Sequence, residues 1–184
     1  KKTTEILNKQ YHDLSSQGYR VLAIAIRDVG KQAKYTKSDE KDMTIIGFIA
    51  FLDPPKHDVK HVLHELHSEG VEIKILTGDN ELVTKKICDD IDLKVKGILL
   101  GNNVDSLSDE ALKARVNDIT IFARFSPDQK NRVIRALKAN GHVVGYLGDG
   151  INDAPSIKTA DIGISVNSGV DVAKETADII LTHK

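Results

Sequence analysis

The sequence contains a single cysteine, no tryptophan and no long uninterrupted run of apolar residues. Because Cys88 is the only cysteine, an internal disulfide and a zinc site built from several cysteines are excluded, and a reducing compartment is the expected setting. A membrane-spanning helix needs roughly 18 consecutive apolar residues, and no segment approaches that length. The first residues do not resemble a signal peptide.

Charge and aromatic content exclude further classes. The 26 Lys and Arg residues nearly balance the 27 Asp and Glu residues, so no excess charge attracts nucleic acid or an anionic membrane. Aromatic residues make up only 4% of the chain, which does not favour base stacking with single-stranded nucleic acid. The remaining composition is that of a globular protein, and 184 residues correspond to one domain plus a remainder, or to part of a larger protein.

The first segment, residues 1–52, differs from the rest of the chain. Its apolar spacing predicts a helix over residues 3–17, followed by two strands over 19–26 and 43–52 that a charged hairpin loop connects. One helix and two strands are too few to bury a core. We therefore expect residues 1–52 to be the C-terminal part of a domain that begins upstream.

Residues 53–56, Asp-Pro-Pro-Lys, come next. Two consecutive prolines stop both a strand and a helix, so this segment is predicted to be a semi-rigid hinge, with a plain turn as the alternative.

Residues 57–184 alternate between predicted helices and predicted strands. This alternation indicates an α/β fold, with a mostly parallel sheet covered by helices on both faces. Ligands bind at the carboxyl ends of the strands in such folds. Polar clusters stand at three of these ends, over residues 77–80, 124–130 and 148–153. The predicted strands cover residues 71–76, 97–100, 119–123, 142–147, 162–166 and 179–181.

The run from Gly148 to Asp153 carries two carboxylates, Asp149 and Asp153, in one short loop. Like charges this close repel each other, and Mg²⁺ relieves the repulsion while taking its other ligands from water and phosphate oxygens. The Asn152 amide can donate to a phosphoryl oxygen. A tight turn is the structural alternative, but the complete run Gly-Asp-Gly-Ile-Asn-Asp-Ala-Pro favours a magnesium site.

Two further clusters supply donors for a phosphate. The Thr77 hydroxyl and the Gly78 amide stand at a helix N-terminus, where they can bind an oxyanion or simply cap the helix. Lys130 lies one turn into the next predicted helix, where it can reach a phosphate or remain an exposed lysine. Together with Asp149 and Asn152 these groups predict a phosphoryl site. The expected nucleophile, an Asp at the end of a central strand, is not visible in the chain.

These motifs, in this order, resemble those of the P-type ATPases, cation pumps that pass through an aspartyl-phosphate and whose phosphorylation domain has the haloacid-dehalogenase-like (Rossmann-like) fold. The resemblance extends over essentially the whole chain, and the run over 75–83 with Leu147 before Gly148 is most similar to the magnesium-transporting subgroup. The matching runs are Asp53-Pro54-Pro55-Lys56, Thr77-Gly78-Asp79, Phe122 through Lys130, and Gly148 through Pro155.

The resemblance implies roles for individual residues, with Mg²⁺ and ATP as cofactors. Thr77, Gly78, Lys130 and Asn152 would hold the phosphoryl group. Arg20, Asp79 and Arg124 would bind the nucleotide, and Asp149 and Asp153 would bind Mg²⁺.

The family's Asp-Lys-Thr-Gly-Thr, Thr-Gly-Glu and Lys-Gly-Ala runs are absent. The resemblance therefore implies a cytoplasmic fragment, with residues 1–52 ending the nucleotide-binding domain and 57–184 forming most of the phosphorylation domain without its central nucleophile strand. Strands 71–76 and 142–147 would then pair across the gap, borrow a strand from another copy, or leave an open slot. We expect this chain alone to form no acid-stable phosphoenzyme.

The implied partners are ATP, the other domains of the same pump, and a transported cation that membrane helices outside this chain would select; nucleic acid is not among them. The implied location is the cytoplasmic face of the cell membrane. One alternative is a soluble phosphatase of the same fold, which would need an Asp-x-Asp run that residues 1–52 lack. Another is a non-catalytic module that binds nucleotide or magnesium. Four histidines over residues 57–67 are interpreted as a solvated helix face rather than a metal site.

Overall fold

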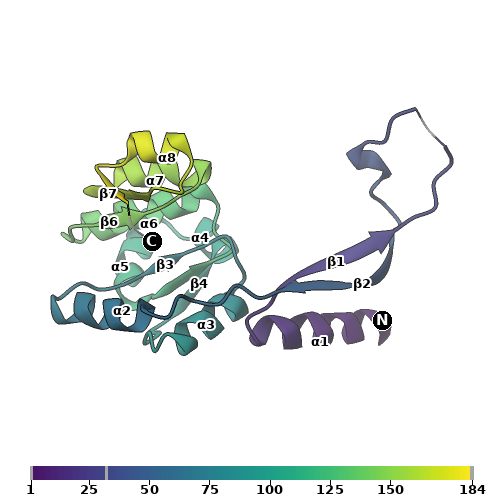
Figure 1. The fold of residues 1–184 in the computed structure, drawn as a ribbon, viewed down its shortest axis with the longest axis horizontal. Helices are drawn as coiled ribbons and strands as arrows, with labels where there is room; N and C mark the ends of the chain where they lie inside the picture. The colour runs from purple at the N-terminus through teal and green to yellow at the C-terminus, as the bar shows by residue number, and fades with distance from the viewer. Residues whose placement is uncertain (1, 32, 183–184) are drawn as a thin grey trace.

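The computed structural model describes residues 2–31 and 33–182. It consists of an N-terminal helix with a long β-hairpin, followed by an α/β body with two separate three-stranded parallel sheets (Figure 1). The predicted α/β class is therefore confirmed.

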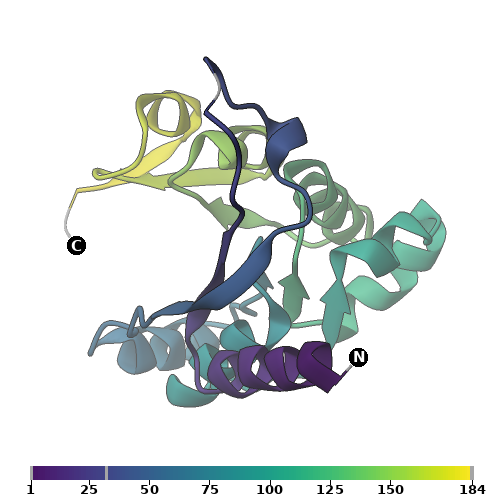
Figure 2. The ribbon, with the colours of Figure 1, turned by 90° about the vertical axis from the view of Figure 1, so that its right-hand side faces the viewer.

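The N-terminal part contains α1 (Lys2–Ser16), β1 (Arg20–Ile26) and β2 (Thr44–Phe51). The two strands pair antiparallel and project away from the body (Figure 1), so that they lie in front of it when that side faces the viewer (Figure 2). Their apolar side chains stay exposed, for example 60% of Leu22 and 59% of Ile46. This exposure is expected for elements too few to bury a core of their own. The connection between the strands includes a short 3₁₀ turn, η1 (Lys37–Asp39).

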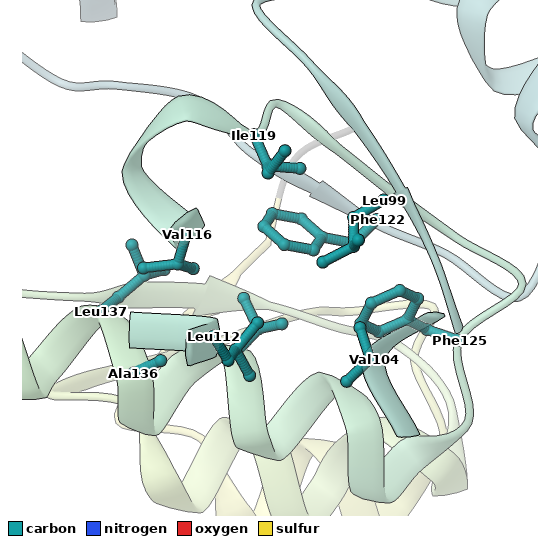
Figure 3. Packing of buried hydrophobic residues seen from close by; sticks show 10 residues of the cluster. Leu99, Val104, Leu112, Val116, Ile119, Phe122, Phe125, Ala136 and Leu137 are labelled. Atoms are coloured by element: carbon teal, nitrogen blue, oxygen red, sulfur yellow. The ribbon is translucent and has the colours of Figure 1, made fainter. Parts of the chain in front are cut away.

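The first parallel sheet has the order β3-β5-β4, and its central strand β5 is covered on both faces. Ile121 and Ala123 of β5 belong to one buried cluster with Cys88 of α3. Phe122, which lies between them and points the opposite way, belongs to a second cluster with residues of the helices α5 and α6 (Figure 3). The alternation along β5 thus confirms helices on both faces of this sheet. Its elements are β3 (Ile75–Leu76), β5 (Ile121–Ala123), β4 (Ile98–Leu100), α3 (Glu81–Asp90), α5 (Asp109–Arg115) and α6 (Pro127–Ala139).

The second sheet has the order β6-β7-β8, and helices cover only one of its faces. Tyr146 of β6 packs there with residues of α6, α7 and α8. On the opposite face, Leu147 is 56% exposed and Ile162 is 41% exposed. The prediction of two covered faces therefore does not extend to this sheet. Its elements are β6 (Gly145–Leu147), β7 (Ile162–Val166), β8 (Ile179–Leu181), α7 (Ala154–Thr159) and α8 (Asp171–Thr176).

Within residues 2–31 and 33–182 no strand pairing joins the two sheets, and β3 and β6 are the edge strands that face each other. Leu76 of β3 and Val144, just before β6, each pack against both of the clusters that contain Phe122 and Tyr146. The two edges therefore share one core, although no strand pairing connects them. Of the three arrangements expected for this gap, direct pairing of β3 with β6 does not occur in the described residues, and in the single copy the slot between the two strands is left without a strand.

The open slot also accounts for two corrections to the predicted strands. The strands expected over 71–76 and 142–147 are reduced to Ile75–Leu76 and Gly145–Leu147. Each forms a ladder on one side only, so its first residues lack the second neighbour that would hold them extended.

Helix α2 (Val59–Ser68) has no fully buried residue, and its apolar stripe is only partly covered.

The remaining elements are short connections: α4 (Gly101–Asp105), η2 (Val116–Asp118) and η3 (Ile151–Asp153). Among the described residues, no helix is both long enough and apolar enough to cross a membrane.

Candidate functional site

The turn after β3 is fixed to the turn after β5 by backbone hydrogen bonds. The Thr77 amide donates to the Phe122 carbonyl at 2.9 Å, and the Phe125 amide donates to the Thr77 carbonyl at 2.9 Å. The Arg124 amide donates to the Asp79 carbonyl at 2.8 Å. Arg124 adopts a left-handed conformation with φ 58°, which costs a non-glycine residue roughly 1 kcal/mol or more. Two of the three predicted polar clusters therefore form one rigid unit.

Thr77 and Asn80 organise the N-terminus of α3. The Thr77 hydroxyl accepts a hydrogen bond from the Asp79 amide at 3.0 Å. The Asn80 side chain caps the helix by accepting from the Val83 amide at 2.9 Å. A hydroxyl that accepts one bond can still donate its own proton. Thr77 thus supports the turn and retains a donor for an oxyanion.

Lys130 connects the third cluster to the other two. Its Nζ lies 2.9 Å from Oδ1 of Asp153, and each of these side chains is only 14% exposed. Lys130 is placed by α6, which begins with Pro127 and a capping box between Ser126 and Gln129. Lys130 and the 148–153 loop are therefore in direct contact.

Asp153 accepts two more hydrogen bonds from the protein. The Tyr146 hydroxyl donates to the same oxygen, Oδ1, at 2.8 Å, and the Gly150 amide donates to Oδ2 at 3.2 Å. Burial by itself raises the pKa of Asp153, but the bonds from Lys130 and Tyr146 outweigh burial and lower it below its ordinary value. Burial, and the bond to Asp153, raise the pKa of Tyr146, so its hydroxyl remains a donor.

Asp149 and Asn152 lie on the exposed side of the same loop. The Asp149 backbone carbonyl accepts from the Val170 amide at 2.9 Å, which ties the loop to the start of α8. The exposed Asp149 carboxylate and the partly buried, hydrogen-bonded Asp153 together supply two oxygen-donor groups. Such a set suits Mg²⁺, which keeps several waters and uses few carboxylates.

No group of three or more His, Cys, Asp or Glu side chains in residues 2–31 and 33–182 is arranged to hold a metal ion. The histidines of α2 are exposed, and Nδ1 of His61 lies 3.6 Å from Oε2 of Glu65.

The three residues predicted to bind a nucleotide line one pocket between the N-terminal part and the body. Arg20 Nη2 lies 2.8 Å from Asp79 Oδ2, and Arg124 makes a two-point contact with Glu81 at 2.7 and 3.1 Å. The pocket measures about 330 Å³. Its walls are formed by Tyr11, Arg20, Val21, Leu22, Gly78, Asp79, Asn80, Val83 and Arg124.

Sequence reasoning missed two residues of this region. Asn80 donates to the Tyr11 hydroxyl at 3.0 Å and to Ser15 Oγ at 3.3 Å, and so joins α1 to α3. Tyr146 holds Asp153. The available signal for Tyr146 was a hydroxyl-bearing aromatic residue near the end of an apolar strand, two residues before the Gly148 loop.

Comparison with known proteins adds an independent finding. The family described as haloacid dehalogenase-like hydrolase matches residues 5–161. The chain is 45% identical over its whole length to a protein named magnesium-transporting ATPase, P-type 1, from Salmonella typhimurium, and 44% identical to its namesake from Escherichia coli. It is 38% identical, over 91% of its length, to a calcium-transporting ATPase from Bacillus subtilis. The chain spans about 20% of the length of the first two relatives and 19% of the third.

Proposed function

Because the chain belongs to the haloacid dehalogenase-like hydrolase family, we propose that it is part of a P-type ATPase and supplies the phosphate and magnesium site of an ATP-driven cation pump. The relatives named as P-type or cation-transporting ATPases cover nearly all of this chain. The pump itself, its ion and its other domains belong to the longer protein, of which this chain corresponds to about one fifth by comparison with those relatives.

One observation carries the proposal: a continuous series of contacts joins three strand ends around the open slot. Backbone bonds join the Thr77 turn to the Arg124 turn, and α6 leads from that turn to Lys130. The Lys130 ion pair with Asp153 then joins α6 to the loop after β6. Phosphoryl transfer depends mainly on positioning and on neutralising charge, and the strand ends that this series of contacts connects carry donors, a cation and carboxylates.

Each residue has a role in this proposal. The Thr77 hydroxyl and the Gly78 amide would donate to the phosphoryl oxygens, with Lys130 as the neutralising cation and Asn152 as a further neutral donor. Asp149 and Asp153 would provide the charge that holds Mg²⁺, with the exposed Asp149 as the direct ligand. When bound, Mg²⁺ would draw charge from the phosphoryl oxygens. Arg20, Asp79 and Arg124 would hold ATP in the pocket beside α1.

The open slot is the place proposed for the missing nucleophile. A strand between β3 and β6 would pair with both edges and complete one continuous sheet. An Asp at its carboxyl end would then lie among Thr77, Lys130 and Asp149. We propose on this basis that residues 1–52 end a nucleotide-binding domain, that 53–56 form a hinge, and that 57–184 complete a phosphorylation domain. The site would then lie at the cytoplasmic face of the membrane.

Magnesium is the transported ion that the comparisons favour, because the relatives named for magnesium transport are 44–45% identical and those named for calcium transport are 36–38% identical. The proposed Mg²⁺ at Asp149 is a separate ion that assists phosphoryl transfer.

Calorimetry with ATP, in the presence and absence of Mg²⁺, tests the site. We expect ATP to bind this chain more tightly with Mg²⁺, and we expect Asp149→Ala to remove that gain. Asp171→Ala is the matched control, because Asp171 is 87% exposed on α8, outside the proposed site. Equal Mg²⁺ dependence in all three proteins would contradict the proposal.

A second measurement addresses the chemistry. Incubation with labelled ATP should leave no acid-stable label on this chain, since its nucleophile is supplied elsewhere. Label recovered at one of its own carboxylates would contradict the assignment of the slot.

A further inference from the structure

A buried tyrosine hydroxyl and a partly buried lysine ammonium meet at one oxygen of Asp153. Lys130 Nζ lies 2.9 Å from Oδ1 of Asp153, and the Tyr146 hydroxyl lies 2.8 Å from the same atom. Tyr146 is 9% exposed, and the side chains of Lys130 and Asp153 are each 14% exposed. The other oxygen, Oδ2, accepts from the Gly150 amide. Both oxygens of the Asp153 carboxylate are therefore hydrogen-bonded to the protein.

The backbone at Gly148 lies close against this contact. A Cβ on Gly148 would stand 2.5 Å from the Cβ of Asp153 and 3.1 Å from Cε1 of Tyr146. The Tyr146 ring packs in a cluster with Ile134, Ile157 and Ala173, which fixes its direction. Gly148 thus allows Tyr146 and Asp153 to meet, and the packed ring determines where the hydroxyl points.

A lysine ammonium depends more than an arginine guanidinium on a partner carboxylate with a fixed orientation. The ammonium is a point charge on a flexible four-carbon stem, and a single carboxylate does not fix its position. A carboxylate that a phenol and a backbone amide hold at both oxygens has one orientation, and it offers the ammonium one place. Without the phenol, the Asp153 side chain can rotate and Lys130 can move with it.

We propose that Tyr146 is a positioning residue for Lys130: by binding Asp153 Oδ1, its hydroxyl fixes the carboxylate that holds the phosphate-binding ammonium in place. This inference rests on the proposed function for the role of Lys130 toward phosphate. The contact itself does not depend on that role, so the two can be tested separately.

The first test measures the lysine directly. Tyr146→Phe keeps the ring in its cluster and removes only the hydroxyl. Nitrogen-15 relaxation of the Lys130 ammonium, in this chain without ligand, should show a lower order parameter in Tyr146→Phe than in the wild type. Ile157→Val is the matched control, because it loosens the same cluster by one methylene without touching Asp153. An unchanged order parameter in Tyr146→Phe, or an equal loss in Ile157→Val, would overturn the proposal.

The second test measures the consequence for binding. The dissociation constant for inorganic phosphate, with Mg²⁺ present, should rise about fivefold in Tyr146→Phe, the effect of losing one ordinary hydrogen bond. In a Lys130→Met background the same substitution should change the constant little. An equal rise in both backgrounds indicates a purely structural role and contradicts the positioning. If phosphate binds none of the proteins while the ammonium still loses order in Tyr146→Phe, the proposed function fails and the positioning contact stands.

Discussion

Arg20 and Asp79 form an ion pair at 2.8 Å that joins strand β1 to the turn after β3. The Arg20 side chain is 51% exposed and the Asp79 side chain 35%, so solvent screens the pair and it adds little to stability. This ion pair lies in the pocket proposed for ATP. Because the pair is weak, an ATP phosphate can replace the Asp79 carboxylate as the partner of Arg20.

The first prediction concerns this arginine. Arg20→Gln should weaken ATP binding by at least about tenfold, since one charge-assisted hydrogen bond to a phosphate contributes roughly 1.5–3 kcal/mol. Melting temperature should change little. Calorimetry measures the affinity. Arg27→Gln is the control, because Arg27 follows the other end of β1 and donates to the Asp39 and Lys41 carbonyls. Equal losses in both variants would place the nucleotide elsewhere.

The second prediction concerns the first glycine of the 148–153 loop. Gly148→Ala should destabilise the fold by about 1–3 kcal/mol, because its Cβ would overlap Asp153 and force the loop to move. Urea unfolding measures this loss. Gly47→Ala in β2, where no atom lies within 4 Å of the added Cβ, should be nearly neutral or slightly stabilising. A neutral Gly148→Ala would show that the loop is not packed as described.

The third prediction is a pH dependence. Burial raises the pKa of Glu81, but the hydrogen bond and charge of Arg124 outweigh burial and lower it below 4.5. A carboxyl with a lowered pKa in the fold contributes stability above its unfolded pKa, and this stability is lost as pH falls through the folded value. Since Arg124 is half exposed, Glu81→Gln should cost under about 1 kcal/mol near neutral pH.

The difference between wild type and Glu81→Gln should therefore shrink as pH falls below about 4. Urea unfolding at a series of pH values measures it. Glu175→Gln, at an exposed position of α8, is the control. A difference that grows toward acid would contradict the pairing.

The fourth prediction concerns the single cysteine. Cys88 is fully buried, and burial raises the pKa of its thiol to about 11. Because the thiolate is the reactive form, iodoacetamide should modify Cys88 only slowly in the folded protein at about pH 8 and quickly after unfolding. Mass spectrometry follows the reaction. A cysteine placed on the surface by Ser106→Cys should react at once, and equally fast reaction of Cys88 would contradict its burial.

The sequence correctly predicted elements whose apolar pattern and end residues are contained in the segment itself. The strands β7 and β8 occur with the predicted bounds, because polar residues flank their apolar runs and mark their ends. Ser126 caps α6 as its position before Pro127 indicates. The meeting of three polar clusters at strand ends also follows from the parallel order of the strands.

Other features depend on contacts between distant residues. Helix α4 was not predicted, because Gly-Asn-Asn-Val-Asp is typical of a turn; a Cβ on Gly101 would lie 2.3 Å from the Arg124 carbonyl oxygen, so a tertiary contact shapes this segment. The pairing of Lys130 with Asp153, and the part of Tyr146 in it, cannot be read from spacing. Whether these residues bind phosphate and Mg²⁺ stays a prediction.

The length of the unpaired strand edges determines where copies of this chain would aggregate. Strand β3 offers an incoming strand only two residues, whereas β1 and β2 present seven and eight, with apolar side chains in contact with water. Long, unprotected edges are the usual templates for aggregation. Precipitation at high concentration should therefore start at the hairpin, and charged residues placed there would improve handling of the purified chain without disturbing the slot.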